Sequence, residues 1–181
     1  ILTYHCDLQL PSGLFNRLVN TVVDFQNHSA AILANHIITY TQDYADHSPF
    51  LSRYKHKLTP ILPPVQLPAV QREAIESFTR EHQINEKRPV IGMATRFASE
   101  KGVEILLEAL PAIFEKYPNA QVLFAGQHLN VMGEEKYFER LAPKIREYEA
   151  QGRWTFLGNL NPTQMAAFYP DLDVLVVPSL N

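Results

Sequence analysis

Residues 91–102, which read IGMATRFASEKG, carry the pattern that decides the fold. An apolar run at residues 90–95 has the composition of a buried strand, and it leads into a loop that contains Arg96 and Lys101. After Gly102 the sequence takes on helical periodicity. Units of strand, loop and helix build parallel sheets, whose ligands collect at the carboxyl ends of the strands. The stretch therefore predicts an α/β fold with two cations at the ligand-binding edge of its sheet.

The same alternation of short apolar runs and longer amphipathic segments extends over the whole chain. Besides residues 90–95, it predicts strands at residues 1–8, 37–41, 58–62, 121–125, 154–157 and 174–178. It predicts helices at residues 13–35, 44–54, 69–82, 103–116, 134–150 and 163–169. In the first of these helices, helical spacing relates Leu14, Leu18, Val22, Phe25, Ala30 and Leu33.

Four prolines crowd the stretch between the third strand and the third helix, namely Pro60, Pro63, Pro64 and Pro68. Proline fixes φ and removes a backbone donor, which suits a semi-rigid connector better than the interior of a sheet. We therefore place a domain boundary here, with one domain at residues 1–66 and the other at residues 67–181.

The charge balance limits the classes of partner. Sixteen basic and nineteen acidic residues leave a formal net charge of -3. Without a bulk positive field, we expect no nucleic-acid partner and at most peripheral membrane contact. The basic run at residues 53–57 is interpreted as a solvated helix end, with contact to lipid headgroups as the alternative.

Cysteine usage and the chain ends indicate the compartment. Cys6 is the single cysteine, which excludes an internal disulfide framework and fits a reducing compartment, so we expect a cytoplasmic protein. The sequence has no signal-peptide pattern and no apolar run of membrane-spanning length. Because it opens and closes on apolar runs and lacks an initial Met, we expect a fragment of a longer protein.

The two cations of the decisive stretch suit a phosphate-bearing ligand. Arg96 offers a planar fork to phosphate oxygens, Lys101 offers a mobile point charge, and Gly102 lets the following helix start close beneath them. The alternative is a solvated loop in which Glu100 pairs with Lys101. Spacing alone leaves both interpretations open.

The text around these residues resembles a known family. Arg96-x4-Lys101-Gly102, followed by Glu104, Leu106-Leu107 and Ala109-Leu110, closely resembles the glycosyltransferase family 4 enzymes of the GT-B fold. Similar segments follow in the same order: Phe124-Ala125-Gly126, Phe156-Leu157-Gly158 and residues 173–179. Residues 4–7 and 34–38 resemble earlier strands of that family more loosely, and the similarity is strongest from residue 89 to residue 179.

The resemblance implies an architecture of two Rossmann-like parallel sheets, both incomplete in this chain. Residues 1–66 would be the last part of the N-terminal, acceptor-side domain together with the hinge. Residues 67–181 would be the first part of the C-terminal domain, which binds the nucleotide-sugar.

The resemblance also implies the activity. It implies a retaining glycosyltransferase that moves a hexose-type sugar from a UDP- or GDP-sugar donor to a glycan or lipid-linked acceptor. Arg96 and Lys101 would hold the donor diphosphate without a metal or other cofactor, and Gly126, Leu157 and Gly158 would lie near the nucleotide. The sequence contains no Asp-x-Asp with a second ligand set, because residues 171–173 precede a strand and are interpreted as a surface turn.

His5 and Asp7 are the candidate site residues of the first domain. The resemblance places His5 near the donor sugar, where a hydrogen bond to a hydroxyl or a phosphate fits better than base catalysis; a structural histidine is the alternative. Asp7 could orient the His5 imidazole or the acceptor hydroxyl, or it could cap the following helix.

Two other functions compete with glycosyl transfer, since fold alone does not separate them. They are a non-catalytic module that binds sugar nucleotides and a GT-B-like nucleotide-sugar epimerase. The spacing of Arg96 and Lys101, with Pro178-Ser179 beyond them, favours the transferase. In the family a Glu-x7-Glu segment follows the Pro-Ser strand, and because this sequence stops at Asn181 we expect the 181-residue piece to be inactive.

Overall fold

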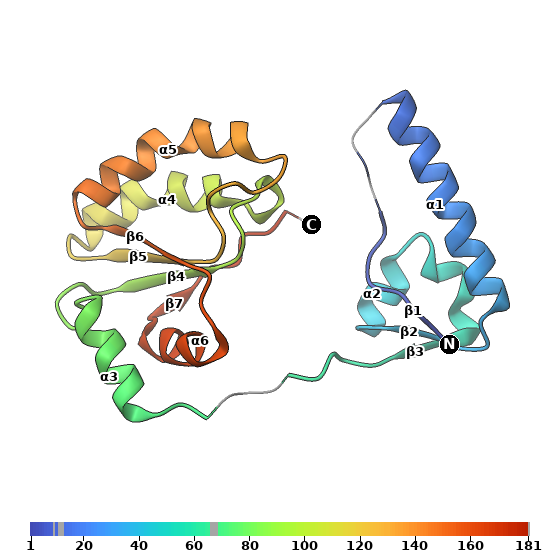
Figure 1. Ribbon diagram of the computed structural model, residues 1–181, viewed down its shortest axis with the longest axis horizontal. Coiled ribbons are helices and arrows are strands. Elements are labelled where there is room, and N and C mark those ends of the chain that lie inside the picture. The colour runs from blue at the N-terminus through green and yellow to red at the C-terminus, as the bar shows by residue number, and fades with distance from the viewer. Residues whose placement is uncertain (9, 11–12, 66–68, 181) are drawn as a thin grey trace. The chain divides into compact units, whose positions relative to one another are not determined.

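The computed structural model describes residues 1–8, 10, 13–65 and 69–180. The chain divides into two compact units, Ile1–Gln66 and Leu67–Asn181 (Figure 1). Each unit contains its own parallel sheet, which confirms the predicted α/β class with two sheets. The acceptor-side and donor-side roles of the units stay predictions.

The sheet of the second unit has the strand order β6-β5-β4-β7. Its strands are β4 (Val90–Ala94), β5 (Gln121–Ala125), β6 (Trp154–Gly158) and β7 (Val174–Leu175). The chain adds β5 and β6 on one side of β4 and then crosses to place β7 on the other side. The order of the strands therefore reverses between β4 and β7, and such a switch point is where open α/β sheets bind ligands.

Helices cover both faces of this sheet (Figure 1). On one face α4 (Val103–Lys116) and α5 (Glu135–Ala150) bury the larger apolar cluster, which includes Phe97 and Phe124. On the other face α3 (Arg72–Glu81) and α6 (Pro162–Phe168) pack around Phe168. Two short 3-10 helices, η2 (Ser99–Lys101) and η3 (Tyr169–Asp171), complete the unit.

The first unit has a three-stranded parallel sheet of order β1-β2-β3. The strands are β1 (Leu2–Thr3), β2 (Ile37–Thr39) and β3 (Leu58–Pro60). The helices are α1 (Leu14–Leu33), α2 (Gln42–His47) and the 3-10 helix η1 (Leu51–Lys57). Their shared core is aromatic, with Tyr4 stacked on Phe50 at a centroid distance of 4.4 Å.

Two expectations about the backbone of this unit are wrong. The single helix predicted at residues 44–54 is two helices, because Pro49 follows Ser48 and disfavours helical backbone there. Pro60 belongs to β3, where it pairs in register with Thr39, and is not part of the connector. An edge strand accommodates proline on its unpaired side. Pro63 and Pro64 have no regular structure, and Pro68 lies outside the described residues.

The spacing of apolar residues predicted the helix α1 correctly, but it did not predict which face of the helix is covered. The apolar residues whose spacing predicted this helix do not mainly face the core of the unit. Leu14 is 87% exposed and Phe25 is 72% exposed, and Leu18, Val22 and Leu33 are exposed too. Only Ala31 is buried among the helical residues, because the side that faces the unit carries small and amide side chains. Helical spacing identified the helix correctly but not the face that the unit covers.

The basic run at residues 53–57 ends the helix η1, and Arg53, Lys55 and His56 are exposed, as expected for a solvated helix end; Lys57 is the exception. Lys57 donates from Nζ to the carbonyl oxygens of Ala31, Ile32 and Ala34, at 3.0, 2.9 and 2.9 Å. These carbonyls end α1 and have no partner within the helix, so the ammonium satisfies them and complements the helix dipole. Lys57 therefore fastens the end of α1 to the end of η1.

Residues 171–173 are not the surface turn that the sequence predicted. The Asp171 side chain is buried and accepts a 2.8 Å hydrogen bond from the Thr79 hydroxyl of α3. Asp173 accepts from the backbone N–H of Val90 and from Arg88, both at 2.6 Å. These carboxylates fasten the start of β7 to α3 and β4.

Among the described residues, no helix is both long and apolar enough to cross a bilayer.

Replacing Lys57 should loosen the end of α1. We expect Lys57→Met to cost about 1–3 kcal/mol of local stability, because it leaves three carbonyls, two of them part-buried, without their charged donor. Amide hydrogen exchange in the last turn of α1 measures the loss. Lys55→Met is the matched control, since Lys55 is exposed and lies 3.4 Å from Asp46. Equal exchange in both variants would contradict the capping role.

Candidate functional site

The loop that follows β4 is held at the carboxyl edge of the second sheet. Its backbone continues the sheet through Thr95 N–H, which donates to Ala125 at 2.8 Å, and Phe97 N–H, which donates to Gln127 at 2.7 Å. The Phe97 ring is fully buried among aromatic side chains. Glu134 then accepts from the backbone and the hydroxyl of Ser99. These contacts fix the position of the predicted cations.

Arg96 lies at the surface of this loop and pairs with Glu100. Its Nη2 is 2.6 Å from Glu100 Oε1, and 62% of its side chain is exposed. The hydrogen bond from Arg96 lowers the pKa of Glu100. A guanidinium has five N–H donors, so one contact to Glu100 leaves others that can meet a phosphate. Glu100 therefore pairs with Arg96, not with Lys101 as the alternative had it.

Lys101 faces a pocket at the switch point of the sheet. The cavity measures about 200 Å³ and is lined by the ends of β4 and by the segment after β7. Lys101 lines it together with the hydroxyl-bearing residues Thr95 and Ser179 and with the apolar residues Met93 and Val176. A pocket at the carboxyl ends of parallel strands that is lined by a lysine and by hydroxyl-bearing residues suits an anionic ligand that also has hydroxyl groups.

Gly102 brings the two sides of this pocket together. Its backbone is left-handed, with φ of +66°, and a Cβ at this position would overlap the carbonyl oxygen of Pro178. Leu180 N–H also donates to the carbonyl of Glu100 at 3.0 Å. The segment after β7 is thereby held against the loop that carries Arg96 and Lys101.

The predicted nucleotide-side residues lie at the ends of β5 and β6. The Gly126 N–H donates to the carbonyl of Gly158 at 2.7 Å, so it is engaged within the protein and is not a free donor. A Cβ on Gly126 would overlap the carbonyl of Thr95, which explains the glycine by close approach of two loops. The Leu157 side chain packs on the α3 and α6 face. Sequence reasoning located this edge but not the use of its backbone groups.

His5 lies in the first unit beyond the end of β1. It is exposed, and its Nδ1 is hydrogen-bonded to the hydroxyl of Tyr40, which follows β2. Tyr40 was missed in the sequence, although its position directly after a neighbouring parallel strand was a usable signal. The role of His5 toward a donor sugar stays a prediction.

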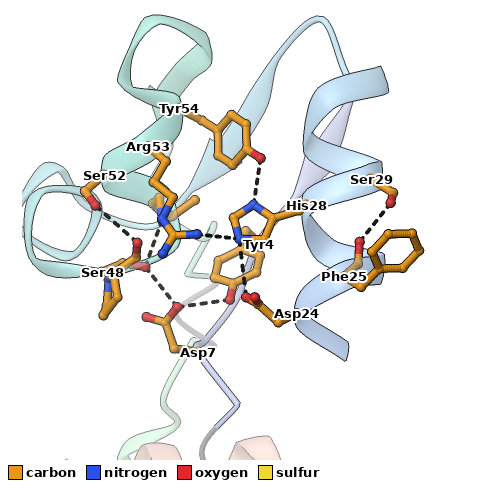
Figure 2. A network of polar contacts seen from close by, with 12 residues as sticks. Tyr4, Asp7, Asp24, Phe25, His28, Ser29, Ser48, Ser52, Arg53 and Tyr54 are labelled. Atoms are coloured by element: carbon orange, nitrogen blue, oxygen red, sulfur yellow. Dashed lines mark hydrogen bonds and ion pairs between the residues drawn. The ribbon is translucent and has the colours of Figure 1, made fainter. Parts of the chain in front are cut away.

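Asp7 joins three elements of the first unit through hydroxyl groups. Its Oδ1 accepts from Tyr4 and Ser48 at 3.0 Å each, and its Oδ2 accepts from Tyr44 at 3.1 Å; Figure 2 shows the bonds to Tyr4 and Ser48. Burial and then the Asp7 carboxylate raise the pKa of Tyr44 to about 12 and that of Tyr4 further. Asp7 does not cap α1, because the N-cap is Gly13 without a side-chain bond.

Metal binding was also considered from the side chains. Within the described ranges, no group of three or more His, Cys, Asp or Glu residues is arranged to hold a metal ion. The metal-free donor site remains an expectation.

Comparison with known proteins gives a family match. The model of the family described as glycosyl transferases group 1 matches residues 74–181. A 2-deoxystreptamine N-acetyl-D-glucosaminyltransferase of Streptomyces fradiae is 28% identical over 183 residues, which cover 98% of this chain and 42% of the relative. An uncharacterised glycosyltransferase of Methanocaldococcus jannaschii is 29% identical over 105 residues, covering 58% of this chain and 25% of that protein.

Solved structures agree on the fold. Anabaena HepE in complex with UDP and glucose superposes with a TM-score of 0.69 at 21% identity, covering 98% of this chain and 46% of that one. The sucrose-phosphate synthase of Thermosynechococcus elongatus gives a TM-score of 0.71 at 23% identity, covering 98% and 43%. These likenesses confirm the GT-B fold class. The chain spans less than half the length of these proteins.

The close approach at Gly102 can be tested against a matched glycine. Gly133 has a φ of +82° but has open space around it. We expect both Gly102→Ala and Gly133→Ala to cost about 1–2 kcal/mol for the left-handed backbone. Gly102→Ala should cost roughly 1–3 kcal/mol more, because the new methyl group overlaps Pro178. Urea unfolding of both variants measures the difference, and equal losses would show that Pro178 moves away freely.

Proposed function

The chain belongs to the glycosyl transferases group 1 family, and we propose that the whole protein transfers a hexose-type sugar from a UDP- or GDP-sugar to a carbohydrate or lipid-linked acceptor. The observation that carries the proposal is the placement of Arg96 and the Lys101 pocket at the switch point of the second sheet. The relative from Streptomyces is named as a glycosyltransferase, and the Anabaena structure holds UDP and glucose, which supports a nucleotide-sugar donor.

In the proposed mechanism the two cations stabilise the leaving group. As the bond between the sugar and the diphosphate breaks, negative charge grows on the phosphate oxygens and the sugar gains oxocarbenium character. Fixed cations that meet this charge lower the barrier without reorganising at the moment of reaction. Arg96 would give the diphosphate a directional fork and Lys101 a point charge. The Glu100 carboxylate keeps the guanidinium at the loop until the diphosphate arrives.

His5 and the acceptor complete the proposal. His5 would donate a hydrogen bond to a hydroxyl or phosphate of the donor, with Tyr40 fixing its ring. Retention of configuration is proposed from the family resemblance alone. Gly126, Leu157 and Gly158 would line the nucleotide side of the donor site.

Removing the guanidinium should slow transfer. We expect Arg96→Ala in the full-length protein to lower turnover by more than about tenfold, since a charge-assisted contact to the leaving group contributes about 1.5–3 kcal/mol. Arg72→Ala is the matched control, because Arg72 makes the same i,i+4 pair with a glutamate at 3.0 Å on α3. Steady-state kinetics of both variants test the assignment. Equal turnover in Arg96→Ala and the unmodified protein would contradict the phosphate contact and favour the alternative, in which Arg96 belongs to a solvated loop.

Donor binding should not depend on a divalent metal. In the proposed site Arg96 and Lys101 would supply the positive charge that the diphosphate needs, so we expect UDP or GDP to bind with the same affinity, within about twofold, in EDTA and in Mg²⁺. Calorimetric titration of the full-length protein provides the measurement. Loss of binding upon chelation would contradict a site built from these two side chains alone.

A further inference from the structure

The first unit contains a polar pocket that the proposed donor site does not use. It measures about 180 Å³, roughly the share of six water molecules. One wall is the amide and carboxylate side of α1, with Asn20, Asp24 and Asn27. The opposite wall comes from Tyr4 and Asp7 after β1 and from the start of η1, where Arg53 lies. Figure 2 shows Tyr4, Asp7, Asp24 and Arg53 converging from these elements.

One amide among the residues that line this pocket is unsatisfied. The Asn20 Oδ1 is buried and has no hydrogen-bond partner among the described residues. Burying such an acceptor is costly, and native structures retain few of them without a reason. A ligand hydroxyl would satisfy the group after rotation of the amide about χ2. Leucine has nearly the shape of asparagine, so nothing in the packing alone requires an amide here.

The charges in the pocket select against anionic ligands. Asp7 and Asp24 contribute two carboxylates against the single cation of Arg53. Arg53 is also engaged, because its Nη1 donates at 2.8 Å to Nε2 of His28. The other His28 nitrogen is hydrogen-bonded to the Tyr54 hydroxyl at 2.7 Å, which holds the imidazole in place. A phosphate would meet more negative charge than positive charge at this site.

The other residues that line the pocket are mainly apolar or aromatic. Tyr4 and Phe50 stack on each other with an interplanar angle of 25°, and both line the pocket with Val23 and Pro49. Asp24 lies at the rim, with 64% of its side chain exposed. Tyr4 and Phe50 are almost fully buried, so the apolar lining offers little stacking surface. The amides and carboxylates can bind the hydroxyls of a sugar ring.

We propose that this pocket binds one unphosphorylated, hydroxylated saccharide ring, in which an amino group is tolerated and a phosphate is not. The volume fits a single ring, the carboxylates and amides match hydroxyl and ammonium donors, and Arg53 supplies a donor for a ring oxygen or hydroxyl. The identification of this ring as part of the acceptor rests on the proposed glycosyl transfer. The binding chemistry itself depends only on the pocket.

Binding of simple sugars to the full-length protein tests the proposal. The probes are D-glucose, D-glucosamine and D-glucose 6-phosphate at millimolar concentration, detected by saturation-transfer difference NMR with UDP in excess. We expect glucose and glucosamine to bind and glucose 6-phosphate to bind at least tenfold more weakly. Asn20→Leu should reduce ring binding at least tenfold. It should also keep or raise the midpoint of thermal unfolding, because it removes an unsatisfied buried atom.

Controls separate this site from the donor site and from misfolding. Asn119→Leu, an exposed position in the second unit, should leave ring binding unchanged. Arg96→Ala should weaken UDP binding and leave ring binding intact. Equal ring binding in Asn20→Leu and the unmodified protein, or preferred binding of glucose 6-phosphate, would overturn the proposal. If UDP binding depends on Arg96 while no neutral sugar binds, this inference fails and the proposed donor site stands.

Discussion

Parallel pairing of β4 with a strand on each side is the constraint on which the second unit depends. β4 pairs with β5 from Val90 to Ala94 and with β7 at Ile91 and Gly92. Because all four strands run the same way, every loop that follows a strand emerges at one edge. This places the loop of Arg96 and Lys101 beside the ends of the neighbouring strands. The site is therefore a consequence of strand direction, and side chains only refine it.

Within each unit, a carboxylate side chain joins elements that are distant in the sequence. Asp173 binds the backbone of β4 just before β7 begins, and Asp7 ties β1 to α2 and to Ser48. Each oxygen of Asp7 and Asp173 has at least one hydrogen-bond donor, which is the condition under which a partly buried carboxylate is tolerated. Among the described residues, the Asn20 amide oxygen lacks such a partner, as do buried side-chain atoms of Thr39, His128 and Trp154.

In the first unit, the polar side of the amphipathic helix α1 faces the rest of the unit. The inner side of α1 offers amides and Asp24 to a polar pocket, while Leu14, Leu18 and Phe25 are exposed. Lys57 at the carbonyl end and His28 within the helix fix it to η1 and to the sheet. Within this chain, which spans less than half the length of its relatives, polar contacts hold α1 in the unit.

The sequence by itself determined the α/β class and the loop in which Arg96 and Lys101 lie, while the two sheets were implied by the family resemblance. It did so because local periodicity and strand-end position are properties of neighbouring residues. The boundaries of α4 and β5 agree with the prediction residue for residue. Only the tertiary structure decided which face of α1 is covered. It also decided that Glu100 pairs with Arg96 and that the Gly126 N–H donates to the carbonyl of Gly158. Those outcomes depend on groups distant in sequence or on competition between nearby partners, which no local pattern records.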